Sequence, residues 1–340
     1  MKICVYGAGA IGGHIAARLA KGGAEVSLVA RGPHLAAILA NGLTVHAPDG
    51  TMHSRPRASA DPAELGPQDA VIVTTKAPAL PAVAAGIGPL LGADTPVAFV
   101  MNGIPWWYHD GTARDGETLP ALDPGDALRR AIGIRRTIGG VVYSAATVTE
   151  PGVVMIETGD ARVILGEVDG RITPRIQAIA DAIAAGGIPA PVVPDIRQAV
   201  WQKLLGNIVT GPLCILGRSC MQDTYTSAEV REAAIRMAGE VIALAAAEGI
   251  TIPGDAPAAR VARSAKLRHK PSILQDLEAG RAMEVEAMFQ APLRLARAAG
   301  VPVPTLSLMV ALATRSAIAA GLYTPPDALA PPDVLAGDAA

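Results

Sequence analysis

The sequence predicts an α/β domain with a doubly wound parallel sheet, followed by an all-helical domain. At 340 residues, the chain is too long for one ordinary compact core. Short apolar runs without alternation recur in the first half, which is typical of parallel strands buried on both faces. From about residue 195 these runs stop, and helical periodicity continues to about residue 320.

The first elements alternate between strand and helix. Residues 2–6 (KICVY) are expected to form a strand that enters the glycine-rich GAGAIGG directly, and residues 14–23 (HIAARLAKGG) a helix that ends at a glycine. Further strands are expected at 25–30, 69–76 and 96–101. This order defines βαβ units and a parallel sheet.

The next segment departs from this alternation. Residues 111–127 are rich in Gly, Asp and Pro and are predicted as a loop. Shorter strands are expected at 137–148, 153–157 and 161–166, as an antiparallel extension of the sheet. A helix is expected at 171–187.

The change of pattern near residues 190–195 sets the predicted domain boundary. We expect an α/β domain at 1–193 and an all-helical substrate and dimerisation domain at 194–323. The remainder, 324–340, is rich in Pro, Ala and Asp and is expected to be a loose tail. The expected helix at 226–248 is nearly all apolar between its charged residues, which favours a homodimer.

Composition excludes several classes of partner. The formal net charge of −2 argues against nucleic acid, and no run of about 18 uncharged apolar residues exists to span a membrane. The three cysteines, Cys4, Cys214 and Cys220, show no C-x-x-C spacing, so neither a disulfide framework nor a metal site is expected. The N-terminus does not have the pattern of a signal peptide, and we expect a cytoplasmic protein.

A G-x-G-x-x-G pattern between the first strand and the first helix predicts a Rossmann-type dinucleotide site. Gly7 permits the tight turn, Gly9 lets the backbone approach a pyrophosphate, and Gly12 lets helix and strand pack closely. Ala10 and Ile11 stand at the helix N-terminus, whose N–H groups attract phosphate. The competing interpretation is a glycine-rich turn in a generic α/β domain.

The residue at the tip of the second strand favours NADP(H) over NAD(H). An acid there would hold the ribose 2′-hydroxyl, but no Asp or Glu lies between Glu25 and Asp49. Arg31 stands there instead, and a guanidinium suits a 2′-phosphate. The alternative is a solvated surface arginine.

Two further polar residues follow strands of the same sheet. Lys76 comes after the strand that ends in TTK, and Asn102 after the next strand. Carboxyl ends of strands face the ligand crevice of an open α/β sheet, so both are expected near the nicotinamide half of the cofactor. Asn102 and Gly103 are equally compatible with an ordinary turn.

The segment WQKLLGN (201–207) places Lys203 and Asn207 one turn apart on a helix with buried-type residues. A buried lysine is costly without partners. Lys203 therefore either extends its stem along an apolar surface, or its amine acts in a pocket.

The motifs together resemble the ketopantoate reductase (2-dehydropantoate 2-reductase) family. The set comprises GAGAIG, Arg31, TTK, NG after the next strand, W-x-K-L-x-x-N, P-S-x-L-Q-D and G-R-x-x-E-V-E, in this order over nearly the whole chain. The resemblance implies reduction of a 2-keto acid by NADPH, from ketopantoate to pantoate, in pantothenate biosynthesis.

The resemblance also implies roles for individual residues. Lys203 would be the acid that protonates the carbonyl oxygen, and Glu284 would orient it and bind the substrate hydroxyl. Ser272 would bind the substrate carboxylate, while Asn102 and Asn207 would position substrate and lysine. A cation aimed at an oxygen that gains negative charge stabilises the transition state. Burial would lower the pKa of the lysine and the glutamate would raise it again.

Two of these residues have plain structural alternatives. Ser272 with Gln275 has the spacing of a capping box, and Glu284 could pair with Arg281 at a helix surface.

The sequence departs from the family pattern around the substrate. Gly211 stands where the family has asparagine, and Pro212 is expected to end or kink the helix. In addition, Trp106, Trp107 and Tyr108 follow Asn102 closely. They could line the substrate pocket or act as a lid, or equally form a loop plug against the second domain or an interface. We therefore expect weak or moderate activity on ketopantoate and acceptance of a bulkier 2-keto acid.

Two other functions remain open at this point. An opine-type, imine or hydroxy-acid dehydrogenase would use the same scaffold, but it usually carries a His-Asp pair, and His269 is the single histidine of the helical half. A non-enzymatic NADP(H) sensor would need neither Lys203 nor Glu284.

Overall fold

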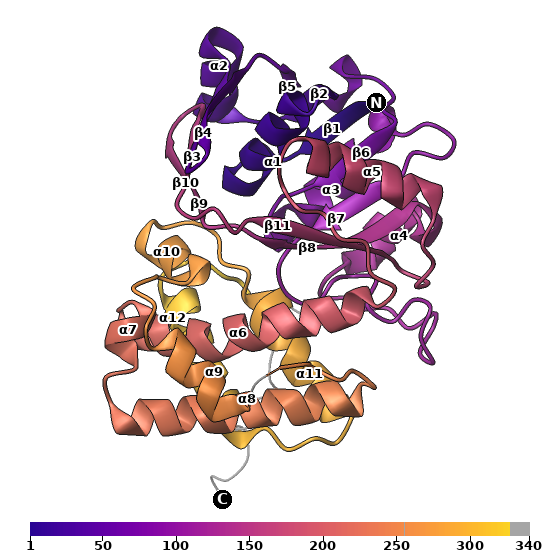
Figure 1. Ribbon diagram of the computed structural model, residues 1–340. Helices are drawn as coiled ribbons and strands as arrows, with labels where there is room; N and C mark the ends of the chain where they lie inside the picture. The colour runs from indigo at the N-terminus through magenta and orange to yellow at the C-terminus, as the bar shows by residue number, and fades with distance from the viewer. Residues whose placement is uncertain (255, 327–340) are drawn as a thin grey trace, which may run out of the picture. The chain divides into compact units, whose positions relative to one another are not determined.

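The computed structural model describes residues 1–254 and 256–326 (Figure 1). The chain forms two compact units, Met1–Lys203 and a second that begins at Leu204. The boundary between the two units falls inside helix α6 (Ile196–Gly217). The domain boundary between residues 193 and 194 stays a prediction from the sequence. Residues 327–340 of the expected tail lie outside the described part of the chain.

A seven-stranded sheet forms the centre of the first unit and confirms the doubly wound α/β prediction. Its order is β11-β8-β7-β6-β1-β2-β5, parallel throughout except for β11, which runs antiparallel to β8. The strands are β1 (Lys2–Tyr6), β2 (Glu25–Val29), β5 (Arg57–Ser59), β6 (Ala70–Val73), β7 (Val97–Val100), β8 (Thr137–Tyr143) and β11 (Arg162–Glu167). The strand order reverses at β1, the position at which such sheets open a ligand crevice.

Five α-helices and five short 3-10 turns accompany this sheet. The helices are α1 (Ala10–Lys21), α2 (Gly32–Asn41), α3 (Leu80–Gly86), α4 (Ala127–Ala131) and α5 (Pro174–Ala185). The turns are η1 (Pro62–Glu64), η2 (Ala77–Ala79), η3 (Gly88–Leu90), η4 (Pro124–Asp126) and η5 (Ile134–Arg136). Helices α1 and α5 lie side by side (Figure 1), and a Cβ at Gly186 would sit 1.9 Å from the Arg18 carbonyl oxygen.

A second sheet, of order β4-β3-β10-β9, corrects part of the sequence prediction. It consists of β3 (Leu43–Ala47), β4 (Gly50–Ser54), β9 (Ala146–Glu150) and β10 (Val153–Ile156). The expectation that strands around 146–157 extend the main sheet was wrong, because they pair with β3 instead. Val154 and Leu43 pack within 3.5 Å of where a Cβ of Gly13 would stand, so this small sheet covers α1.

The second unit is helical throughout its described residues. After α6 it contains α7 (Met221–Thr224), α8 (Ala228–Ala247), α9 (Pro257–Ser264), α10 (Ser272–Glu278), the π-turn η6 (Glu286–Gln290), α11 (Ala291–Ala298) and α12 (Pro304–Ala319). Pro212 does not end α6, contrary to one alternative from the sequence. Buried side chains on both sides of the proline, Ile208, Leu213 and Ile215 among them, hold the helix together.

By length and composition α6 could cross a membrane. However, 72% of its most apolar window is buried within the molecule, which is the behaviour of a core helix.

Candidate active site

The glycine turn has the shape that a dinucleotide requires. Gly7 has a φ of +106°, and Thr74 of the TTK segment donates its hydroxyl to the Gly7 carbonyl at 2.7 Å. A Cβ at Gly12 would lie 2.0 Å from that same carbonyl oxygen, so only glycine fits there. A Cβ at Gly9, in contrast, would have no atom within 4 Å, which leaves the approach to the helix N-terminus open.

The N-terminus of α1 is free to receive an anion. Its cap, Gly9, offers no side-chain hydrogen bond, and its first turn contains no acidic residue. Ala10 and Ile11 are half-exposed there. The residues present therefore fit the pyrophosphate of a dinucleotide.

Arg31 lies beside this turn at the end of β2. The N–H groups of Gly7 and Ala8 donate to the Val29 carbonyl at 3.0 and 3.3 Å, which ties the turn to that strand. Burial raises the pKa of the Tyr6 phenol, and the positive charge of the nearby Arg31 guanidinium acts in the opposite direction. The exposed Arg31 is thus held next to the nucleotide turn.

Lys76 and Asn102 occupy equivalent positions on neighbouring strands. Val73 of β6 pairs with Phe99 of β7, and each polar residue follows three positions later. Both side chains are half-exposed at the carboxyl edge of the sheet, where the sequence predicted them.

The amine of Lys203 is directed to the same sheet edge. Its Nζ donates to the carbonyl of Val142 at the end of β8 and lies 5.4 Å from the ring centroid of Tyr143. This contact does not fit the alternative in which the amine extends into solvent. The guanidinium of Arg162 lies 3.8 Å from the same ring, so two cations share one aromatic surface.

The structure rejects the capping-box interpretation of Ser272. Pro271 is the N-cap of α10, and Ser272 is an exposed first residue of that helix. Gln275 donates to the Lys270 carbonyl at 2.9 Å instead of serving a capping box. The Ser272 hydroxyl is therefore not assigned to a cap.

Glu284 is buried, with 6% of its surface exposed, two residues before the start of the π-turn η6. Arg281 forms an ion pair with Asp276 at 3.0 Å, and the burial of Glu284 argues against a pair at the helix surface. Single π-turns of this kind are frequent at functional sites. Asn207 is half-buried on α6, one turn beyond Lys203.

The aromatic triplet does not line a pocket or form a lid. Trp106, Trp107 and Tyr108 are 2%, 1% and 2% exposed, which is the burial expected of a loop plug. Trp106 packs edge-on against Phe99 at 5.7 Å, and Trp107 fills the space left by Gly139 of β8. These three residues therefore no longer support the expectation of a bulkier substrate.

Sequence reasoning missed three contributors to this region. Thr74 fixes the glycine turn, and the ring of Tyr143 lies near both Lys203 and Arg162. For Thr74 a signal existed, because TTK follows a strand end. Tyr143 and Arg162 carried none, since they meet only through antiparallel pairing of β8 with β11. No group of three or more potential metal ligands occurs among residues 1–254 and 256–326.

These features define a class: an oxidoreductase that binds a nicotinamide dinucleotide on a Rossmann-type unit and continues into a helical unit. The family model for Ketopantoate reductase PanE/ApbA matches residues 3–170, and that for its C-terminal domain matches residues 195–316. The chain belongs to the ketopantoate reductase family, whose enzymes use NADPH.

Individual relatives agree with this assignment. A 2-dehydropantoate 2-reductase of Mesorhizobium japonicum is 40% identical over 328 residues, covering 95% of this chain and all of the relative. The crystal structure of 2-dehydropantoate 2-reductase from Geobacter metallireducens superposes with a TM-score of 0.82 at 29% identity, covering 93% of this chain and all of that one. A ternary structure of D-mandelate dehydrogenase with NADH and anilino(oxo)acetate shares the fold, at a TM-score of 0.79 and 22% identity over 95% of this chain and all of that one.

Proposed function

We propose that this protein reduces 2-dehydropantoate to pantoate with NADPH. The observation that carries the proposal is the lysine amine of Lys203, directed to the carboxyl edge of a sheet whose glycine turn fits a dinucleotide. The names of the relatives support this reaction over an opine-type dehydrogenase or a non-enzymatic sensor.

NADPH supplies the hydride when it is bound. Lys203 is proposed to donate the proton to the keto oxygen, which gains negative charge as the carbon is reduced. The ammonium donates one hydrogen bond to the Val142 carbonyl, which directs it to the sheet edge. For Asn102, Asn207, Ser272 and Glu284 we propose the roles that the family resemblance implies.

The cofactor site is proposed to consist of the glycine turn with Ala10 and Ile11, Arg31 for the 2′-phosphate, and Lys76 with Asn102 near the nicotinamide. The domains 1–193 and 194–323 are proposed to bind cofactor and substrate, respectively. We further propose a cytoplasmic homodimer in pantothenate biosynthesis, formed through the helical domain. A sedimentation mass of one chain at micromolar concentration would reject the dimer.

The test of the reaction is the consumption of NADPH with 2-dehydropantoate and with a panel of branched and aromatic 2-keto acids. Lys203→Ala is expected to lower kcat by about 10²–10⁴-fold, with unchanged affinity for NADPH. Lys21→Ala is the matched control, because this lysine is exposed and pairs with Asp49 at 3.6 Å. Near-normal turnover of Lys203→Ala would reject the proposed role, and a strong preference for another keto acid would reject the substrate.

A further inference from the structure

The buried loop 105–110 is fixed to the beginning of helix α6 by one arginine. Arg197, in the first turn of α6, donates to the carbonyls of Tyr108 at 2.7 Å, of Val168 at 3.0 Å and of Asp110. Its guanidinium lies 5.4 Å from the ring centroid of Trp107. Three carbonyl acceptors and one aromatic face leave the guanidinium little freedom to move.

A second contact follows one helical turn later. Trp201 donates its indole N–H to the hydroxyl of Tyr108 at 2.8 Å, and both side chains are buried. The rings of the two residues meet edge-to-face with centroids 6.4 Å apart. The loop therefore holds α6 at two points on the same side of the helix.

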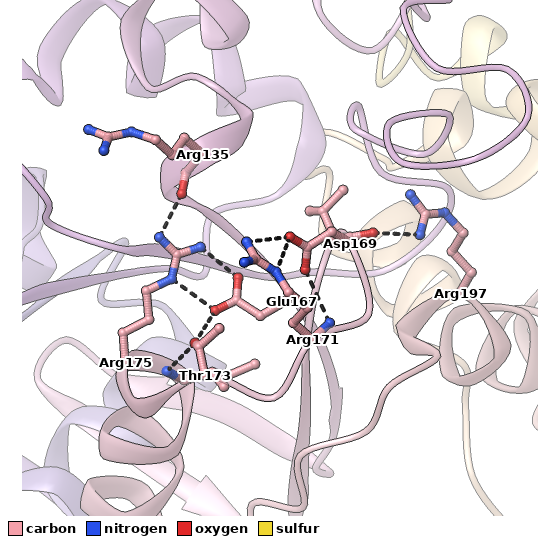
Figure 2. A network of polar contacts seen from close by, with 9 residues as sticks. Arg135, Glu167, Asp169, Arg171, Thr173, Arg175 and Arg197 are labelled. Atoms are coloured by element: carbon pink, nitrogen blue, oxygen red, sulfur yellow. Dashed lines mark hydrogen bonds and ion pairs between the residues drawn. The ribbon is translucent and has the colours of Figure 1, made fainter.

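Ion pairs with helices α4 and α5 hold the loop and the end of strand β11. Arg129 of α4 binds both carboxylate oxygens of Asp110, at 2.6 and 2.7 Å. Val168 follows Glu167 at the end of β11, and Arg175 of α5 donates to Glu167 at 2.6 and 2.8 Å. Figure 2 shows this network with Arg197 beside it.

From this geometry we infer that Tyr108, Arg197 and Trp201 form a clamp that positions Lys203. The inference rests on the proposed function, in which Lys203 is the proton donor. Lys203 stands two residues beyond Trp201, about 3 Å further along the helix axis. Its stem has a fixed length, so the placement of the helix backbone sets whether the amine reaches both the Val142 carbonyl and the keto oxygen. A displacement of about 1 Å at a reacting group can cost about 10²-fold in rate.

This role accounts for an aromatic triplet that the catalytic proposal leaves unused. Tyr108 presents its hydroxyl to the helix, and Trp107 supports the guanidinium of Arg197. Trp106 differs from its neighbours, because its ring contacts Phe99 of β7 and Arg129 of α4. Trp106 is therefore the control position for substitutions of the clamp residues.

The test compares Tyr108→Phe and Trp201→Phe with the control Trp106→Phe. Each clamp variant is expected to lower kcat by about tenfold, while KM and the Kd for NADPH stay within about twofold, because only the proton donor moves. The pH profile of kcat is expected to shift in the clamp variants, since the amine changes surroundings, and to stay unchanged in the control. The double variant is expected to be no worse than the more affected single variant, because both remove one hydrogen bond.

Two outcomes overturn the clamp. In one, the clamp variants lower Tm but keep the kcat and pH profile of the unmodified enzyme. In the other, Trp106→Phe reproduces their kinetic defect. Lys203→Ala separates this result from a failure of the proposed function: an inactive Lys203→Ala enzyme with normal clamp variants rejects the clamp alone, whereas an active one rejects the catalytic role itself.

Discussion

A methyl group added at Gly9 is expected to weaken cofactor binding without loss of stability, whereas one added at Gly12 is expected to lower stability. Both glycines belong to the same turn, yet their surroundings differ. At Gly12 a Cβ would stand 2.0 Å from the Gly7 carbonyl oxygen and 2.5 Å from the Thr74 hydroxyl. At Gly9 it would meet no atom within 4 Å, and the backbone there, with φ of −66° and ψ of −165°, is one that alanine adopts readily.

The magnitudes follow from these distances. Gly12→Ala forces a backbone oxygen to move, and overpacking of this kind costs about 1–3 kcal/mol. For a unit of 203 residues that corresponds to a fall in Tm of about 2–12 °C. Gly9→Ala is expected to leave Tm unchanged within about 2 °C, because nothing in the protein opposes the methyl group.

The same Gly9→Ala methyl group would occupy the space above the N-terminus of α1. It is expected to remove close contact between a phosphate and one N–H group, a charge-assisted hydrogen bond of about 1.5–3 kcal/mol. The Kd for NADPH should therefore rise about 10- to 100-fold. Thermal denaturation without cofactor and fluorescence titration with NADPH measure the two effects. Wild-type NADPH affinity in Gly9→Ala, or a wild-type Tm in Gly12→Ala, would refute the reasoning.

Three further predictions concern charge. Arg31→Ala is expected to narrow the preference for NADPH over NADH by about 10- to 100-fold, the equivalent of one charge-assisted contact, as measured by kcat/KM for each cofactor. Burial, together with the charge of Arg18, lowers the pKa of His14 from 6.5 to about 4. As the pH falls below 6.5 the unfolded chain takes up the proton first, so the free energy of unfolding should fall by up to about 3 kcal/mol between pH 6.5 and 4. Urea denaturation of His14→Gln over the same pH range should lack this loss. Glu240 accepts the N–H groups of Thr305 and Leu306 at the start of α12, at 3.0 and 2.7 Å; Glu240→Gln should cost about 1 kcal/mol in urea denaturation, and equal stability would show that the charge is not needed.

The parts of the fold that the sequence predicted are those set by local constraints. The glycine turn was predictable because Gly7 and Gly12 are required by backbone geometry within a few residues and by the strand next to them. The apolar strands of the main sheet were predictable for a related reason, since every residue of β1 after Lys2 is buried. Neither inference needed knowledge of distant partners.

The missed strands lacked that kind of signal. β3 and β4 are short and partly exposed, and they contain histidines and threonines in place of a continuous apolar run. Pro48 and Asp49 form the two-residue turn between them, and this turn pair followed by Gly50 was the one readable sign of the hairpin.

The sequence left the aromatic triplet open between a pocket wall or lid and a loop plug, for a different reason. Its position after a strand end suggested the mouth of a cleft, but burial is decided by partners far along the chain. Gly139 provides the space for Trp107, and Trp201 provides the donor for Tyr108. Similarly, the acceptor of Lys203 is a backbone carbonyl, which leaves no trace in the residue type.

The carboxyl end of β8 serves two helices at once, because successive side chains of a strand point to opposite faces. Ser144 meets the histidine of α1, and the preceding residue, Tyr143, meets Lys203 of α6. A slip of one residue in β8 would exchange these faces and separate the amine from its aromatic surface. Gly139 opposes such a slip, because any Cβ at that position would lie 2.6 Å from Trp107. The register that packs the aromatic loop is thus the same register that brings Lys203 to the sheet edge, and Gly139 favours both.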